Sequence, residues 1–170
     1  DATALAGRDV NTFVQAVTAE GMWKDLEESL RALRTDYIDI YQFHNPAFCP
    51  KPGGEDGLDE AALEAKRPGK IRHISITNHR LAVAHEAIDS GLYATLQFPY
   101  SYLSGEKDRE LVDKCREKGM GFIAMKGMAG GLLQNGTVAA AWMARQEGVV
   151  PIWGIQHEWE LDQWRELTER

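Results

Sequence analysis

The chain has 170 residues, of which 44% are hydrophobic and 26% are charged. These values suit a globular domain with a core of its own, and no apolar run is long enough to span a membrane. The net charge of −7 argues against a nucleic-acid partner, which needs clustered Lys and Arg side chains. The two cysteines, Cys49 and Cys115, form no CxxC pair, and the five histidines show no metal-ligand spacing. We therefore expect a cytoplasmic protein with free thiols, no metal ion, and neither nucleic acid nor a membrane as a partner.

Strand and helix patterns alternate along the chain from residue 18 onward. Thr18 has the chemistry of an N-cap, and apolar residues then recur at helical spacing as far as Leu33. Residues 1–17 show no clear pattern. The predicted helices cover residues 19–34, 58–66, 81–90, 106–118, 137–147 and 159–170, and the predicted strands cover 37–43, 71–76, 93–98, 121–125 and 149–153.

Strict alternation of strands and helices predicts an α/β fold with a parallel sheet and right-handed crossovers. A doubly wound sheet and part of an eight-stranded barrel both fit this order. Polar residues follow at or near the carboxyl end of every predicted strand, which favours the barrel, because a doubly wound sheet concentrates its site at one crevice. The sequence therefore predicts a single incomplete (β/α)8 TIM barrel domain of about five βα units over residues 1–170.

The strand predicted over residues 37–43 is dense in Ile, Tyr and Phe and leads into His44. Asn45 and Pro46 end it and open a long Pro- and Gly-rich loop over residues 45–57. His44 thus lies at the carboxyl end of a strand, where α/β proteins bind ligands. The alternative is a core histidine that is hydrogen-bonded to the backbone.

Three other strand ends carry groups that suit one ligand. The amides of Asn78 and Gln97 can hold another amide, and the glycine-rich loop over residues 126–131 can expose backbone N–H groups to an anion. With His44 beside a carbonyl oxygen, these groups describe a nicotinamide site next to a carbonyl substrate. Each also has a structural interpretation: a turn-forming Asn, a satisfied buried Gln and an ordinary flexible loop.

Three segments, residues 25–46, 69–79 and 121–131, resemble the aldo-keto reductase family. The resemblance runs from about Thr18 to the end of the chain. It implies a (β/α)8 barrel that moves a hydride between NAD(P)H and a carbonyl group, with a small-molecule aldehyde or ketone as substrate.

The resemblance also implies roles for single residues. His44 matches the active-site histidine that orients the substrate carbonyl, and Gly154 precedes residues without the basic side chain that contacts the 2′-phosphate of NADP. NADP and NAD therefore both remain open as cofactors. Met125 stands where many members have a tyrosine on the nicotinamide ring. The residues implied in cofactor binding are Thr77, Asn78, Gln97, Met125, Lys126, Gly127, Gly130, Gly131 and Gly154.

The family also uses an Asp, a Tyr and a Lys from its first three strands, whereas the five strands of this chain match strands four to eight. None of the five tyrosines stands at the position of the catalytic acid: Tyr37, Tyr41, Tyr93, Tyr100 and Tyr102. We expect either a fragment of a full reductase with its amino-terminal segment missing, which we favour, or a short protein that closes its barrel by self-association or with a partner. By itself the chain should show no reductase turnover.

A second functional class remains open. The cofactor contacts without the acid tyrosine would also suit a non-catalytic nicotinamide-binding barrel that serves as a regulatory or interaction subunit. A cofactor-free hydrolase is the weakest alternative, because the sequence has no nucleophile elbow.

Overall fold

The computed structural model describes residues 18–168, and the unpatterned residues 1–17 and the last two residues of the predicted final helix lie outside that range. Helices and strands alternate through the described part. They are α3 (Ala19–Leu33), β1 (Ile38–His44), α4 (Leu58–Lys66), β2 (Ile71–Thr77), α5 (Leu81–Ser90), β3 (Thr95–Pro99), α6 (Glu106–Glu117), β4 (Gly121–Met125), the 3-10 turn η1 (Ala129–Gly131), α7 (Gly136–Met143), β5 (Val149–Pro151) and α8 (Glu158–Thr168). No helix of this part is both long and apolar enough to cross a membrane.

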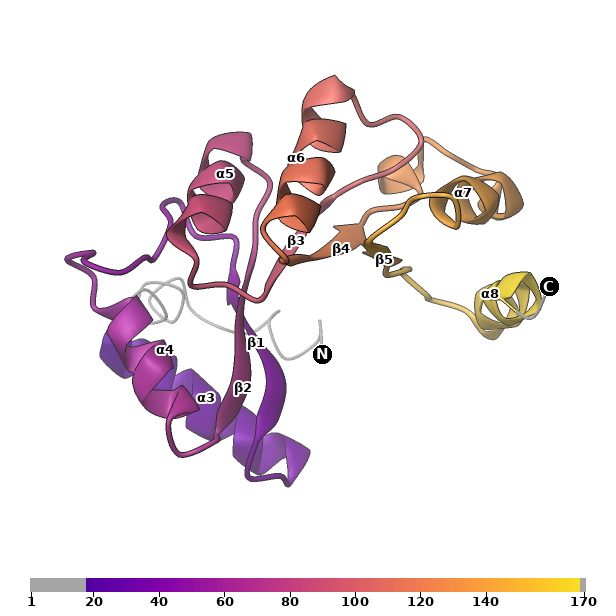
Figure 1. The fold of residues 1–170 in the computed structure, drawn as a ribbon. Coiled ribbons are helices and arrows are strands. Elements are labelled where there is room, and N and C mark those ends of the chain that lie inside the picture. The colour runs from indigo at the N-terminus through magenta and orange to yellow at the C-terminus, as the bar shows by residue number, and fades with distance from the viewer. Residues whose placement is uncertain (1–17, 169–170) are drawn as a thin grey trace.

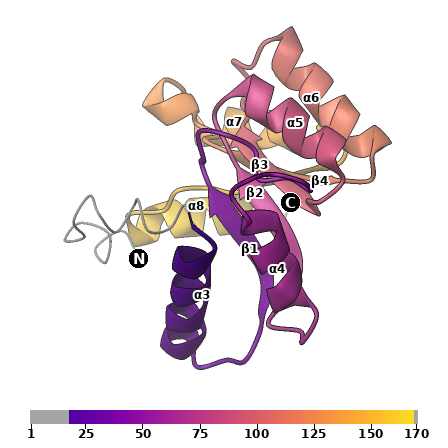
Figure 2. The ribbon, with the colours of Figure 1, turned by 90° about the vertical axis from the view of Figure 1, so that its left-hand side faces the viewer.

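The five strands form one parallel sheet in the order β1-β2-β3-β4-β5, as the sequence predicts. The sheet is curved, and helices α3 to α7 follow its outer side (Figure 1). Helix α3 packs beside α4 and α5 beside α6, and both pairs can be followed in Figure 2. Within the described residues, β1 and β5 each pair with one neighbour only, so the sheet is an open arc and not a closed barrel.

The helix α3 illustrates how the sequence sets these elements. Thr18 is its N-cap, as predicted, and the Thr18 Oγ1 accepts a hydrogen bond of 3.0 Å from the Gly21 N–H. Met22, Leu26 and Leu30 recur every four residues and are buried against the sheet side. The apolar stripe therefore fixes which face of α3 meets the rest of the molecule.

The hydrophobic core lies between the outer face of the sheet and the helices. Alternate strand residues fill it, among them Ile76, Leu96 and Phe122. The opposite, inner face carries apolar side chains that stay accessible: Ile40 is 42% exposed and Val150 is 62% exposed. The chain thus completes its outer layer and leaves its inner face open.

Both cysteines are free and buried, in agreement with the expectation of free thiols. Burial raises the pKa of the Cys49 thiol to about 11 and that of the Cys115 thiol to about 12. Both side chains are therefore protonated at neutral pH and pack as small apolar groups.

Three predicted elements, two strands and one helix, have different bounds in the structure. Strand β3 begins at Thr95, two residues late, and it includes Pro99, because the next N–H, that of Tyr100, still donates to the Met125 carbonyl over 3.0 Å. Helix α7 ends at Met143, because beyond it the backbone N–H groups of Arg145 and Gln146 donate to the carbonyl three residues earlier and not four, as in a turn. Strand β5 ends at Pro151, two residues early.

Candidate functional site

Three predicted site residues form one row across the sheet. His44 on β1 pairs in register with Thr77 on β2, which pairs with Gln97 on β3. In parallel strands, residues in register face the same side. The neighbouring residues Phe43 and Ile76 are buried in the outer core, so the row faces the inner side. The structure thus brings His44, Thr77 and Gln97 together near the carboxyl edge of the sheet.

His44 is the last residue of β1, and its side chain is exposed. Its imidazole makes no hydrogen bond to any residue in the range 18–168. The alternative of a core histidine bonded to the backbone is therefore wrong. A free imidazole at this edge can donate to an oxygen atom of a ligand.

Weak polar contacts surround Gln97. The Gln42 Nε2 donates to the Gln97 Oε1 over 3.4 Å, and the Gln97 Nε2 and the Thr77 Oγ1 donate to the Met125 Sδ over 3.6 Å and 3.9 Å. A thioether sulfur is a poor acceptor, so both donors gain by turning to a carbonyl oxygen of a ligand. Gln42 was missed in the sequence, although its parity with His44 places it on the same face.

Asn78 does not belong to the row of site residues on the inner face and has a structural role instead. Its side chain is fully buried, and its Nδ2 donates to the Pro46 carbonyl over 2.8 Å. Its Oδ1 accepts from the backbone N–H groups of His79 and Arg80, each at 2.9 Å. The Asn78 side chain therefore ties the loop after β1 to the start of α5.

We expect Asn78→Ala to lower the free energy of unfolding by about 2–3 kcal/mol, because two backbone N–H groups lose their acceptor. The Pro46 carbonyl keeps only its longer contact of 3.4 Å with the Arg80 guanidinium. Asn135→Ala is the matched control: the Asn135 Oδ1 makes a single exposed capping bond of 3.1 Å to the Val138 N–H, and its loss should cost about 1 kcal/mol. Urea unfolding of both variants checks the difference. Equal losses would contradict the role given to Asn78.

The loop that follows β4 has an unusual backbone. Lys126, Ala129 and the glycines Gly130 and Gly131 all have positive φ, from 50° to 95°. Such residues turn successive N–H groups into a concave surface that suits an anion. The N–H groups of Gly127 and Met128 donate to no acceptor in the described part of the chain.

Position 127 requires glycine for a steric reason. A Cβ atom there would lie 2.4 Å from the Trp153 ring. Trp153 in turn stacks on Trp164 of α8, with ring centroids 4.0 Å apart. The loop after β4 is thus held against the chain that follows β5.

Gly154 lies three residues beyond β5, at the start of the segment that leads into α8. The Glu160 Oε2 accepts the backbone N–H groups of Gln156 and His157 at 2.6 Å and 2.9 Å. These bonds lower the pKa of the Glu160 carboxyl below its ordinary value. The backbone N–H groups that precede α8 are therefore already bonded to a carboxylate of the chain itself.

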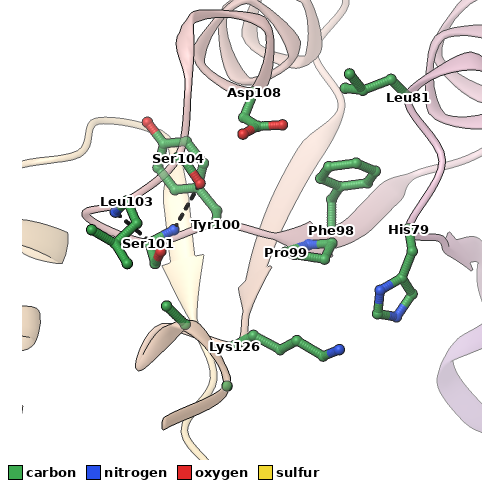
Figure 3. Close-up of a pocket in the computed structure, with 12 residues that line it drawn as sticks. His79, Leu81, Phe98, Pro99, Tyr100, Ser101, Leu103, Ser104, Asp108 and Lys126 are labelled. Carbon is green, nitrogen blue, oxygen red and sulfur yellow. Dashed lines mark hydrogen bonds between the residues drawn. The ribbon is translucent and has the colours of Figure 1, made fainter. Parts of the chain in front are cut away.

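A pocket of about 470 Å³ opens beyond the carboxyl ends of β3 and β4 (Figure 3). Phe98 and Leu81 supply apolar walls, while Lys126, His79 and Asp108 supply charged or titratable groups. Lys126 joins this pocket, whereas His44, Thr77 and Gln97 do not line it. His79 was missed as a site residue, although it directly follows the predicted Thr77–Asn78 pair.

Three of the five tyrosines have hydroxyl groups that are engaged away from the inner face. The hydroxyls of Tyr41, Tyr93 and Tyr100 donate to Met22, Pro50 and Gln146 respectively. Burial raises the pKa of all three phenols, that of Tyr41 to about 12. A phenol that donates a proton at neutral pH needs the opposite shift. No group of three His, Cys, Asp or Glu side chains within residues 18–168 is arranged to hold a metal ion.

The family model described as "Aldo/keto reductase family" matches residues 9–149, which is most of the chain. The chain belongs to the aldo/keto reductase family. The match begins upstream of Thr18, where the resemblance in the sequence was first evident. It confirms the predicted membership of the aldo-keto reductases.

Relatives and solved structures agree with the family match. The chain is 30% identical to the methylglyoxal reductase DkgB of Salmonella typhimurium over 78% of this chain and 50% of that protein. It is 28% identical to an NADH-specific methylglyoxal reductase of Escherichia coli over 91% of this chain and 48% of that protein. An aldo-keto reductase from Bacillus halodurans, 21% identical, matches with a TM-score of 0.76 over 89% of this chain and 63% of that one, which confirms the predicted fold. The chain spans about half the length, or less, of the curated relatives it matches.

Proposed function

We propose that the intact protein containing this chain is a carbonyl reductase, which reduces an aldehyde or ketone to an alcohol with a nicotinamide cofactor. The observation that carries the proposal is the row of His44, Thr77 and Gln97 in register on the inner face. A free imidazole, a hydroxyl and an amide at one sheet edge suit a carbonyl substrate beside a carboxamide. Family membership supports the same reaction class.

Each group has a defined task in this proposal. The imidazole of His44 donates to the carbonyl oxygen and fixes the orientation of the carbon that is reduced. Gln97 and Thr77 exchange their weak contacts with Met125 for the carboxamide of the cofactor. When bound, the cofactor supplies the hydride. Asn78 would contribute to cofactor binding by holding the loop after β1 and the start of α5 in place.

The loop over residues 126–131 would face the cofactor's pyrophosphate. Its unpaired N–H groups at Gly127 and Met128 and its run of positive φ angles fit an anion. Gly154, which follows β5, would complete the set.

The proton donor of the reaction would come from outside residues 18–168, because the hydroxyls of Tyr41, Tyr93 and Tyr100 are engaged elsewhere. Tyr37 precedes β1, at the end of the sheet away from His44, and the Tyr102 ring packs against Trp142. We propose that an additional segment of the same polypeptide supplies the proton donor and closes the barrel.

The test is cofactor oxidation by the intact protein with a reactive aldehyde such as methylglyoxal, followed by the absorbance of NADH or NADPH. Steady, aldehyde-dependent oxidation is the expected result. If the cofactor binds with saturation but no aldehyde or ketone is reduced, the non-catalytic nicotinamide-binding barrel takes the place of the reductase. The residues of the row would then serve binding alone.

We expect NADH to be preferred over NADPH, because the Glu160 carboxylate holds the N–H groups of Gln156 and His157 and would repel an added phosphate. Glu160→Gln should improve the Kd for NADPH by about two- to fivefold, the range for one charge at an exposed helix terminus, and leave the Kd for NADH unchanged. Glu158→Gln, which removes an exposed charge from the same first turn, is the control. An equal gain in both variants would assign the effect to net charge and not to Glu160.

A further inference from the structure

The inner face of the sheet carries a second polar row beside the row of site residues, two residues nearer to the amino-terminal ends of the strands. Gln42 on β1 pairs in register with Ser75 on β2, and Ser75 pairs with Thr95 on β3. Bulky branched side chains normally fill the interior of a (β/α)8 barrel. A row of polar side chains at this place therefore needs a reason, because a polar group buried without a partner costs free energy.

Two members of this second row satisfy each other. The Ser75 Oγ and the Thr95 Oγ1 lie 2.6 Å apart, and Ser75 is completely buried. Gln42 behaves differently, because its Nε2 donates to the Gln97 Oε1 in the row of site residues over 3.4 Å. Among the described residues, the amide of Gln42 has no other hydrogen-bond partner. Gln42 thus links the second row to the site.

The amide of Gln97 has one favoured orientation between its two neighbours. Its Oε1 faces Gln42, and its Nε2 faces the Met125 sulfur over 3.6 Å. Turning Gln97 alone would set its NH2 group against the donor of Gln42. Turning both amides together would keep their mutual bond but would set the Gln97 oxygen against the Met125 sulfur, and both of these atoms are acceptors. Gln42 and Met125 therefore favour the same orientation of Gln97.

We propose that Gln42 is a positioning residue, which holds the Gln97 amide so that its NH2 group faces the ligand. The carboxamide of the cofactor is then recognised by its oxygen and not by its NH2 group. The Thr77 hydroxyl supplies a second donor for that oxygen, because it too donates to the Met125 sulfur, over 3.9 Å, in the free site. The role of Gln42 in holding Gln97 follows from these contacts, whereas the identity of the ligand rests on the proposed function.

A site that offers only donors should accept any group with the same carbonyl oxygen. The 3-acetylpyridine analogue of NADH keeps this oxygen but has a methyl group in place of the carboxamide NH2. Isothermal titration of the intact protein measures the Kd for both reduced dinucleotides. We expect the two Kd values of the wild-type protein to agree within about threefold, because both ligands accept the same hydrogen bonds. A larger difference, with the analogue bound more weakly, would overturn the proposed orientation of Gln97.

Gln42→Glu should reverse the orientation of Gln97. An ionised carboxylate only accepts hydrogen bonds, so at mildly alkaline pH it should draw the Gln97 NH2 group toward itself and turn the Gln97 oxygen toward the ligand. The carboxamide NH2 of NADH can donate to that oxygen, and the acetyl group of the analogue cannot. The Kd for the analogue should therefore rise by about tenfold relative to the Kd for NADH.

Gln42→Leu removes the donor without replacing it, so the Gln97 amide is free to turn. Both dinucleotides should then bind about two- to tenfold more weakly, because the orientation is no longer fixed before binding. Thr95→Val is the matched control: it removes a hydroxyl from the same row, and this hydroxyl contacts Ser75 and not Gln97. Neither Kd should change by more than about twofold in this variant. Thermal unfolding of each variant confirms that it is folded at the temperature of the titration.

The ratio of the two Kd values separates positioning from a merely structural role. A structural role would lower the stability of the Gln42 variants and leave this ratio as in the wild type, so an unchanged ratio in Gln42→Glu would overturn the proposal. Equal effects of Gln42→Glu and Thr95→Val would overturn it too. In both cases the binding of NADH to the wild type would leave the proposed function standing. If the wild-type protein binds neither dinucleotide, the proposed function is overturned as well.

Discussion

Replacing His44 with Ala should lower kcat/KM for aldehyde reduction by the intact protein by about 10²- to 10³-fold. The imidazole is exposed at the end of β1 and bonded to no described residue, so the loss falls on the contact with the carbonyl oxygen and not on the fold. The Kd for NADH should stay unchanged, because Gln97 and Thr77 keep their places. Steady-state kinetics and cofactor titration together check both statements.

His73→Ala is the matched control for this prediction. His73 lies on β2 and faces the same side of the sheet as Thr77. It pairs in register with Ile40, which precedes His44 by four residues on β1. It is exposed, like His44. We expect its removal to change kcat/KM by less than about twofold, as for a surface substitution away from the site. Similar losses in the two variants would sink the assignment of His44 to the substrate carbonyl.

Replacing Phe122 with Ala should lower the free energy of unfolding by about 3–5 kcal/mol. Phe122 is 1% exposed and points from β4 into the core between sheet and helices. Its ring meets the Tyr100 ring edge-on, with centroids 5.6 Å apart. Truncation therefore removes an aromatic pair and leaves a cavity that rigid strands cannot close.

Urea unfolding of the intact protein measures this effect as a shift of the midpoint at constant slope. Phe48→Ala is the control, because Phe48 lies exposed in the loop after β1. Its loss should change stability by no more than about 0.5 kcal/mol. A small shift for Phe122→Ala would mean that the outer core repacks around β4 without cost.

Local chemistry made most of the fold predictable. The boundaries of α4, α5 and β4 agree with the sequence pattern because glycines, prolines and N-terminal acidic residues mark them. For the start of β3, the wrong prediction has its cause in a distant contact. Tyr93 has strand character, yet its hydroxyl bonds to the Pro50 carbonyl and β3 starts after it. No local pattern encodes that bond.

The candidate site was predictable to a similar degree. The alternation of side chains along β1 places His44 on the other face of the sheet from Asp39. The strand register then aligns His44 with Thr77 and Gln97. His79 and Lys126 line the same pocket although they lie 47 positions apart in the sequence, and only the folded chain shows that they share it. The two backbone bonds to the Asn78 oxygen likewise depend on how the loop turns into α5.

The contact between Gly127 and Trp153 limits how this chain can diverge. Any side chain at position 127 would meet the Trp153 ring at 2.4 Å, and stacking on Trp164 prevents the ring from moving back. The three positions are therefore coupled by direct contact. A larger residue at 127 becomes tolerable only after the indole at 153 has been lost, so we expect descendants to change position 153 before position 127.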